Sequence, residues 1–478
     1  MLKPLYNKAV KSALFKNSIW GLTSNFLQVL FLSMFFIITA RKYDTTQFAH
    51  FLIATTIYQL IVAFSSMGLG QWFIREFPNQ ADQKAFVSKF FKLQMWLGGM
   101  FYIVNIVAIL LLYANTQIRW LSIILGTNII FDNLIYAIKN LNVAEGRQRT
   151  TFSILVLDGF LKLLIGCFLF IQPISIIVLS LLTLVVRFST LNIFLRVGST
   201  NTLDFRALWH SRIEWTDIKH HILSNWKFVV IGSISIFYWR FANIIVSKFL
   251  TLHDVANYEI SFRIFSICLL VPAVASATVF VRFNRLFKEG NFTALTGYYS
   301  QLLFAYNAFA FAGFAFIYPY ANDILSIAFG EKFVDGTSCL RQMFLTFLIF
   351  PTVLLQATLI VAMKNEDIDM WLNVLGLVIN IVLCCVGLYF IKSLSVVNYS
   401  IFISFLMFHI LQNIFLIKKG IVKTLNCVAF YVFLTAFIVG YTMIANTFDH
   451  NWVFVLFCIT FSIVILFRLT SKLKRVAI

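Results

Sequence analysis

The sequence predicts an all-α polytopic membrane protein of about fourteen transmembrane helices, arranged as two pseudo-repeated six-helix lobes and a C-terminal pair. Two observations predict this class. Hydrophobic residues make up 60% of the 478-residue chain and charged residues only 12%. Apolar runs of roughly 20 residues, the length that crosses a bilayer as a helix, recur along the whole chain. The short alternating segments of a membrane β-barrel are absent from the sequence.

The apolar runs define the expected spans and their orientation. The spans are approximately 18–39, 48–69, 92–113, 120–138, 152–171, 174–194, 223–249, 256–280, 300–320, 337–362, 371–391, 396–416, 425–445 and 451–468. The first run has no small-residue cleavage site, so we expect a retained span and not a signal peptide. Most of the 38 Lys and Arg residues fall in connections on one side, which the positive-inside rule makes cytoplasmic, together with both termini. Residues 1–17 form either a basic helix on the membrane surface or a solvated lead-in.

The two halves of the chain share a pattern. When the sequence is shifted by 207 residues, 43–51 (YDTTQFAHF) lies over 250–258 (LTLHDVANY), and each segment follows an odd-numbered span and opens the next one. We therefore expect a two-lobed transporter with its cavity at the lobe interface. The predicted organisation is an N-lobe at 1–197, a cytoplasmic linker at 198–222, a C-lobe at 223–420, and a final part at 421–478 with two spans and a basic tail.

The sequence contains no motif for catalysis, metal binding or a cofactor. The seven Cys residues lie in or beside apolar runs without metal-ligand spacing, and we interpret them as small hydrophobic residues. His210, His220 and His221 in the linker also lack ligand spacing. His409 stands alone within a span, where we expect a hydrogen-bonded core residue. We predict no enzyme, no metal and no cofactor, and the net charge of +19 resides in short loops, which argues against nucleic-acid binding.

Ionisable side chains inside the spans are the strongest functional signal, because each is costly at the bilayer centre unless it is paired or hydrated. The acids are Asp132, Asp158 and Glu259, and the deep bases are Lys162, Arg187, Arg240 and Arg263. Helical spacing sorts part of this set. Asp158 and Lys162 are four residues apart, as are Glu259 and Arg263, so each pair shares one helix face.

The other three groups lie on separate spans. Asp132 and Arg187 lie at similar depths, so a pair across two helices is expected, with a structural and a functional role both open. Arg240 has no obvious partner, and the alternatives are a buried guanidinium satisfied by carbonyl groups or Glu259, or a planar donor fork that binds phosphate oxygens. On the second reading, Arg240→Ala abolishes function while the protein still accumulates.

Several motifs resemble one family of membrane proteins. They are Ser66–Gly70 followed by Arg75-Glu76, Glu145–Arg147, Val255–Tyr258 leading to Arg263, and Ile324–Phe333. With these motifs the chain resembles the polysaccharide-exporter branch of the multidrug/oligosaccharidyl-lipid/polysaccharide (MOP) superfamily, and looks like a Wzx-type O-antigen flippase. The chain departs from the family where Asp44 and Asp254 replace a frequent Gly, and where Arg240 replaces an acid.

The resemblance implies alternating access and an undecaprenyl-pyrophosphate-linked oligosaccharide as cargo, in a bacterial inner membrane. Arg240 and Arg263 would bind the phosphates, with Lys162 and Arg187 adding positive potential, while Asp158, Glu259 or Asp132 would serve in ion pairs or coupling. Membrane lipids, a polysaccharide polymerase and chain-length proteins are the expected partners. The alternatives are a drug/cation antiporter of the same superfamily, a membrane polymerase or glycosyltransferase, and a non-transporting scaffold.

A comparison of the two halves of the chain predicts that charge is distributed unevenly between the two lobes of the cavity. Ser33 occupies the position that matches Arg240, and Thr56 the position that matches Arg263. We therefore expect the cationic groups to be concentrated in the second lobe, with mostly polar, uncharged groups in the first.

Overall fold

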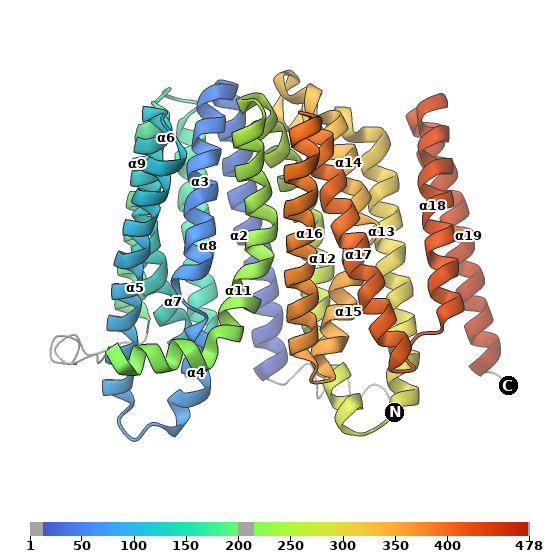
Figure 1. Ribbon diagram of the computed structural model, residues 1–478, viewed down its shortest axis with the longest axis horizontal. Coiled ribbons are helices and arrows are strands. Elements are labelled where there is room, and N and C mark those ends of the chain that lie inside the picture. The colour runs from blue at the N-terminus through green and yellow to red at the C-terminus, as the bar shows by residue number, and fades with distance from the viewer. Residues whose placement is uncertain (1–12, 199–214, 477–478) are drawn as a thin grey trace. The chain divides into compact units, whose positions relative to one another are not determined.

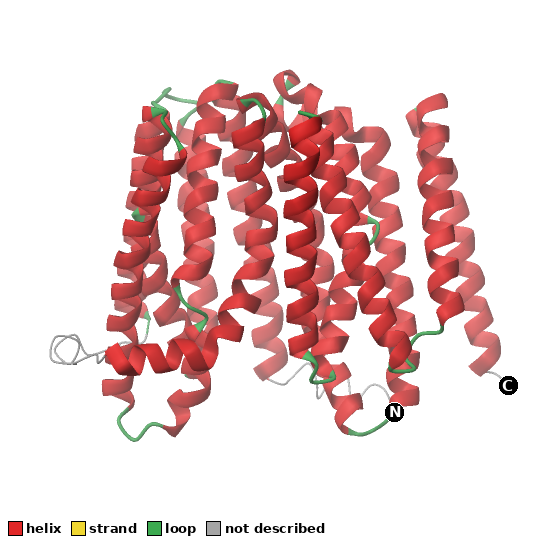
Figure 2. Cartoon of the chain, in the orientation of Figure 1, coloured by secondary structure: helices red, strands yellow, loops and turns green. Residues whose placement is uncertain are grey.

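The computed structural model describes residues 13–198 and 215–476, and within these ranges it contains helices and no strand (Figure 2). The first half contains α2 (Ala13–Lys42), α3 (Thr45–Ser65), α4 (Leu69–Glu76), η1 (Phe77–Asn79), α5 (Gln83–Leu112), α6 (Thr116–Gly126), α7 (Asn128–Ala144), α8 (Gln148–Phe168) and α9 (Ile176–Val197). The second contains α11 (Trp215–Phe249), α12 (Leu252–Lys288), α13 (Phe292–Phe329), η2 (Glu331–Gly336), α14 (Thr337–Phe347), α15 (Phe350–Ala362), α16 (Glu366–Phe390), α17 (Leu394–Lys418), α18 (Thr424–Thr447) and α19 (His450–Val476).

The helices confirm the predicted fold class, an all-α polytopic membrane protein. Twelve stretches of the described chain are long and apolar enough to cross a membrane, so the expected count of about fourteen is approximate. The predicted spans 223–249 and 451–468 fall on α11 and α19, which are not among the twelve. Residues 1–12 and most of the predicted linker lie outside the described residues. Part of that linker is helical, because α11 already begins at Trp215.

The fourth and tenth predicted spans are each broken into two helices, α6–α7 and α14–α15. The helices before the breaks, α6 and α14, are each 11 residues long. Each ends in a tightened turn, in which the N–H of Thr127 bonds to the Ile124 carbonyl and that of Leu348 to the Leu345 carbonyl. Pro351 follows the second break and cannot donate a backbone hydrogen bond.

The helix boundaries repeat between the halves with the predicted shift. One turn follows α2, which ends at Lys42, and leads to α3 at Thr45, while another follows α11, which ends at Phe249, and leads to α12 at Leu252. Each pair of boundaries is 207 residues apart. Side chains fix both starts, because the carboxylate of Asp44 caps α3 and Asp254 exchanges hydrogen bonds with Thr251 before α12. The two broken spans occupy equivalent places in this repeat.

The chain divides into two units, Met1–Ile260 with Cys384–Lys392 and Ser261–Leu383 with Ser393–Ile478. The first unit therefore includes α11, which packs along α3 and α4, and in Figure 1 the start of α11 runs crosswise to these helices. The second unit contains α13–α15 and α17–α19. The domain boundaries expected from the sequence stay a prediction.

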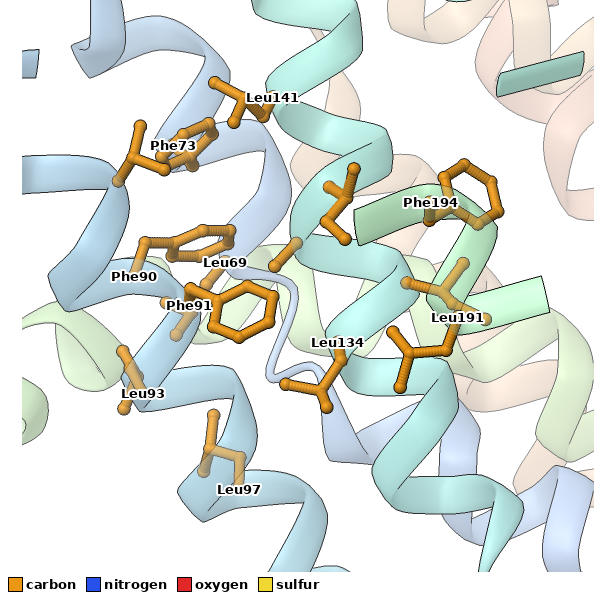
Figure 3. Packing of buried hydrophobic residues seen from close by; sticks show 14 of the residues in the cluster. Leu69, Phe73, Phe90, Phe91, Leu93, Leu97, Leu134, Leu141, Leu191 and Phe194 are labelled. Carbon is orange, nitrogen blue, oxygen red and sulfur yellow. The ribbon is translucent and has the colours of Figure 1, made fainter. Parts of the chain in front are cut away.

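A cluster of buried apolar side chains holds α4 in place at one end of the first unit. Leu69 and Phe73 of α4 pack with side chains of α5, α7 and α9 (Figure 3). The rings of Phe73 and Phe90 are stacked with their centroids 4.2 Å apart. Such ring pairs contribute about 0.5–1.5 kcal/mol beyond the burial of their area. This packing fixes the turn between α3 and α4, which forms one wall of the site described next.

Candidate functional site

The first unit contains an open cavity of about 550 Å³ near the end of the bundle where α3 and α7 end. Its lining residues come from α3, the α3–α4 turn, α7, α9 and α11. They are Val62, Ala63, Ser66, Gly68, Gln71, Asp132, Asn133, Ile135, Tyr136, Lys139, Arg187, Val229, Ser233 and Ile236. Ser233 ties α11 to α3, since its hydroxyl donates to the Ala63 carbonyl at 2.8 Å. The cavity is mixed in chemistry, with apolar walls and a set of charged and amide groups.

The α3–α4 turn brings backbone close to α7. Met67 and Gly68 both have positive φ, 50° and 61°, a conformation that glycine adopts without strain. The N–H of Gly70 then donates to the hydroxyl of Tyr136 at 2.9 Å. A Cβ atom at Gly70 would lie 2.3 Å from that hydroxyl and 2.6 Å from Oδ1 of Asn140. A larger residue fits here only if the side chains of Tyr136 and Asn140 move or α4 shifts against α7.

Gly70→Ala should therefore destabilise the protein. Overpacking of this kind costs about 1–3 kcal/mol, and the unfolding temperature in detergent should fall accordingly. Gly99→Ala is the matched control, because a Cβ there meets nothing within 4 Å. Combining Gly70→Ala with Tyr136→Phe removes the nearest clashing atom and should restore part of the loss. Equal unfolding temperatures for the two single variants would contradict this packing argument.

Four charged side chains form a network beside the cavity. The Arg187 guanidinium lies between two carboxylates: its Nε donates to Oδ1 of Asp132 at 2.5 Å, and its Nη1 lies 3.3 Å from Oδ1 of Asp158. Lys162 donates to the second oxygen of Asp158 at 2.8 Å. The predicted pairs Asp132–Arg187 and Asp158–Lys162 are both present, and Arg187 joins them into one network with equal numbers of positive and negative charges.

Uncharged groups complete this network. Thr190 donates to Oδ1 of Asp158 at 2.9 Å, and the hydroxyl of Tyr58 donates to Oδ2 of Asp132. The side chain of Asp158 is 1% exposed and that of Asp132 is 12% exposed. Asp132 lines the cavity and Asp158 does not. A ligand or a proton that enters the cavity therefore reaches Asp132 first.

Lys139 is a cavity residue that the sequence reasoning missed. It lies on α7 two turns after Asp132 and lines the same cavity. Among the described residues, its ammonium group makes no hydrogen bond and no ion pair. Since the Asp132–Arg187 pair is neutral, Lys139 supplies the surplus positive charge of the cavity. The missed signal was its register, because Lys139 follows Asp132 by seven residues and so lies on nearly the same helix face.

Two further polar groups face this positive charge. The side-chain nitrogen of Asn133, a residue 1% exposed, has no acceptor among the described residues, while its oxygen accepts from Ser65. Gln71 contributes a second amide to the lining. Together with Lys139 and Arg187, these groups offer hydrogen-bond donors to an anion, the arrangement that phosphate oxygens require. Most polar residues of the lining are uncharged, but Asp132, Lys139 and Arg187 carry charge, and the expected concentration of cationic groups in the second lobe stays a prediction.

Arg240 has a partner, and it is Glu259, one of the alternatives that the sequence left open. Its Nη1 lies 2.6 Å from Oε1 of Glu259, and Asn243 donates to the other carboxylate oxygen at 2.8 Å. The side chains of Arg240 and Glu259 are only 14% and 4% exposed. The sequence reasoning paired Glu259 with Arg263, one helical turn away, while the contact that the structure shows joins α11 to α12 within the first unit. Arg263 belongs to the second unit, and its pairing with Glu259 stays a prediction.

Replacing Arg240 alone should lower the amount of folded protein, because it leaves the buried Glu259 carboxylate without its cation. Breaking a buried pair in this way costs about 3–5 kcal/mol. The double variant Arg240→Gln/Glu259→Gln should recover much of the folded protein, as measured by fluorescence-detected size-exclusion chromatography. If the double variant accumulates but does not transport, the Arg240–Glu259 pair contributes to function as well as to stability. Full transport by the double variant would show that the pair is structural only.

Three predicted basic site residues do not line the cavity: Lys162, Arg240 and Arg263. Arg187 and Asp132 therefore line the cavity, while Lys162 and Asp158 belong to the same charged network but do not line it. The described residues contain no group of three or more His, Cys, Asp and Glu side chains that could hold a metal ion.

Solved structures with a similar fold include a lipid flippase and multidrug transporters. The lipid II flippase MurJ, in an inward closed conformation, matches 95% of this chain and 100% of its own with a TM-score of 0.73 and 12% identity. An inward-facing multidrug resistance MATE family transporter of the MOP superfamily matches 83% of this chain and 97% of its own with a TM-score of 0.66 and 12% identity. A MOP superfamily transporter from Pyrococcus furiosus matches 85% and 95% with a TM-score of 0.57 and 15% identity.

No protein-family model and no curated protein sequence matches the chain. At these identities the structural matches establish the fold alone. The chain is a multi-pass membrane protein with the fold of MOP-superfamily transporters. Its structural neighbours include both MATE transporters and the lipid II flippase.

Proposed function

We propose that this protein is a flippase that moves an undecaprenyl-pyrophosphate-linked oligosaccharide, such as an O-antigen repeat unit, across the bacterial inner membrane by alternating access. The observation that carries the proposal is the cavity of the first unit with its surplus positive charge at Lys139. A pyrophosphate cannot cross the hydrocarbon core unless the protein neutralises and hydrogen-bonds it. The expected location has both termini in the cytoplasm, with polymerase and chain-length proteins as further partners.

Lys139 and Arg187 are the proposed first contacts for phosphate oxygens. A mobile ammonium group can follow a moving ligand, while the planar guanidinium binds two oxygens at once. The amide of Asn133 adds a donor that has no other acceptor among the described residues. Arg240, Arg263 and Lys162 stay proposed contributors to the positive potential along the path. The polar groups Gln71, Tyr136 and Ser233 of the same cavity suit the hydroxyl groups of a glycan.

We propose that cargo transport is coupled to proton movement through competition between the cargo and Asp132 for Arg187. A phosphate that binds Arg187 competes with Asp132 for the guanidinium, so cargo binding frees the Asp132 carboxylate to exchange a proton. Asp132 is therefore the proposed coupling acid in preference to Asp158, which does not line the cavity. The Glu259 carboxylate is bound by Arg240 and Asn243, and we assign it to the ion pair and not to coupling. Transport that continues unchanged after the proton gradient is collapsed would eliminate this coupling scheme.

The function can be tested with purified protein in liposomes that contain fluorescent undecaprenyl-pyrophosphate-oligosaccharide. A reagent that quenches only the outer leaflet reports the translocated fraction. We expect the protein to raise the rate of exchange between leaflets well above that of empty liposomes. Equal rates would refute the proposal. In cells, deletion of the gene should leave the lipid-linked oligosaccharide on the inner leaflet, with its synthesis intact.

A drug or cation antiporter is the second candidate, because MATE transporters share the fold. A cavity for organic cations needs surplus acid, whereas Asp132 is the one acid among the described lining residues and is already paired with Arg187. Export of a fluorescent organic cation by the purified protein, without exchange of the lipid-linked oligosaccharide, would favour the antiporter. Polymerase or glycosyltransferase activity would instead lengthen the glycan chains, which mass spectrometry of the lipids recovered from the liposomes would detect.

A further inference from the structure

The second unit contains a smaller cavity that the proposed function does not use. It has a volume of about 170 Å³ and lies between α13, α15, α17 and the start of α18. Its polar lining consists of four side-chain amides and one imidazole: Asn307, Gln356, His409, Asn413 and Asn426. Lys, Arg, Asp and Glu are absent from the described residues that line it. Since one water takes up about 30 Å³ in the liquid, the cavity has room for a group several times larger than a water molecule.

A hydrogen-bond network holds the deep wall of this cavity. His409, which is 2% exposed, contacts Thr352 at 3.2 Å and the hydroxyl of Tyr431 at 3.0 Å. Gln356 donates to Asn413 at 2.8 Å, and Asn413 donates to Tyr431 at 2.9 Å. His409 is thus a hydrogen-bonded core residue, as the sequence predicts. The network fixes the orientation of the amides before any ligand arrives.

Two oxygens of this wall lack partners among the described residues. They are Oε1 of Gln356, a residue only 1% exposed, and Oδ1 of Asn307. A buried acceptor that is left unpaired costs about 1–3 kcal/mol. Gln356 and Asn307 both line the cavity, so a ligand with hydroxyl or N–H donors would satisfy them. The side chain of Phe430 adds an aromatic face beside His409, and such a ring can pack on the apolar face of a sugar.

We propose that this pocket binds a single neutral sugar ring. Uncharged amides recognise hydroxyl groups. Because no basic side chain lines the described part of the pocket, nothing there would neutralise the negative charge of a phosphate. Asn426, in the first turn of α18, is exposed and marks the opening. The sugar can come from a soluble glycan or from the headgroup of a glycolipid, which share this chemistry. The proposal does not depend on the cationic cavity of the first unit.

The test uses the full chain in nanodiscs of phosphatidylethanolamine and phosphatidylglycerol. In one arm, saturation-transfer NMR detects binding of free glucose and N-acetylglucosamine. In the other, native mass spectrometry compares retention of a monoglucosyl diacylglycerol with that of phosphatidylglycerol. A signal in the first arm assigns a soluble sugar, and preferential retention in the second alone assigns a glycolipid.

Asn307→Leu is the variant of choice, because Oδ1 of Asn307 makes no internal hydrogen bond that the substitution would break. We expect it to weaken sugar binding about tenfold. Thr435→Val on the exposed face of α18 is the control and should bind like the unmodified protein. If Asn307→Leu does not fold, Asn426→Leu tests the same pocket from its opening. The absence of both signals, or signals that the pocket variant leaves unchanged, would overturn the proposal and assign the pocket to water.

Discussion

Replacing Lys139 by glutamine should slow transport of the anionic lipid-linked cargo about ten- to hundredfold while the protein accumulates normally in the membrane. Lys139 makes no hydrogen bond and no ion pair among the described residues, so its removal breaks nothing that holds the fold. Its loss removes the surplus positive charge of the cavity and one charged hydrogen bond to phosphate. Such a bond contributes about 1.5–3 kcal/mol, which corresponds to roughly a ten- to hundredfold lower rate of exchange in the liposome assay.

Two further variants make this result specific. Lys139→Arg keeps the charge and should retain a measurable part of the transport. Lys89→Gln removes an exposed lysine of α5 in the same unit and should transport normally. Normal transport by Lys139→Gln, or an equal loss in Lys89→Gln, would show that the cavity charge is not used for the cargo.

Replacing Arg187 by glutamine should have the opposite profile, with a large loss of folded protein. Arg187 is held between Asp132 and Asp158. Without it, Asp132 loses its cation and Asp158 keeps only Lys162. Removing one partner of a buried ion pair costs about 3–5 kcal/mol, which is a large fraction of the stability of a typical protein. The unfolding temperature and the yield from the membrane should both fall.

The double variant Asp132→Asn/Arg187→Gln distinguishes the effect of Arg187 on stability, through charge balance, from its effect on cargo binding. It removes the carboxylate together with its cation and leaves Asp158 with Lys162, so the yield should recover while transport stays low. Arg196→Gln, on the exposed part of α9, is the control and should change neither quantity. A single Arg187→Gln variant with the yield and unfolding temperature of that control would contradict the role of Arg187 as the centre of the network.

Local pattern was sufficient to predict much of this molecule. Apolar runs located the helices, because crossing a bilayer requires about 20 apolar residues with internally satisfied backbone. The shift of 207 residues located the turns before α3 and α12, where polar side chains cap the helices. The pair Asp158–Lys162 followed from four-residue spacing, which places two side chains on one helix face whatever the tertiary structure.

The site depended on contacts between helices, which spacing along one helix does not reveal. Lys139 follows the apolar stretch of its span, where a lysine also serves topology, and only the packing of α3, α9 and α11 around α7 shows that it lines a cavity. Glu259 shares a helix face with Arg263, and only the packing of α11 against α12 shows that its carboxylate also meets Arg240. The amides around His409 are scattered over more than one hundred residues and carry no local motif.

The sequence by itself therefore determined the class of protein, the helices, the internal repeat and the set of charges that had to be paired. The tertiary structure alone decided which partners those charges take and which basic group is left over for a ligand. The physical reason is that burial in the membrane makes pairing obligatory for each charge on its own, while the choice of partner depends on which helices pack side by side.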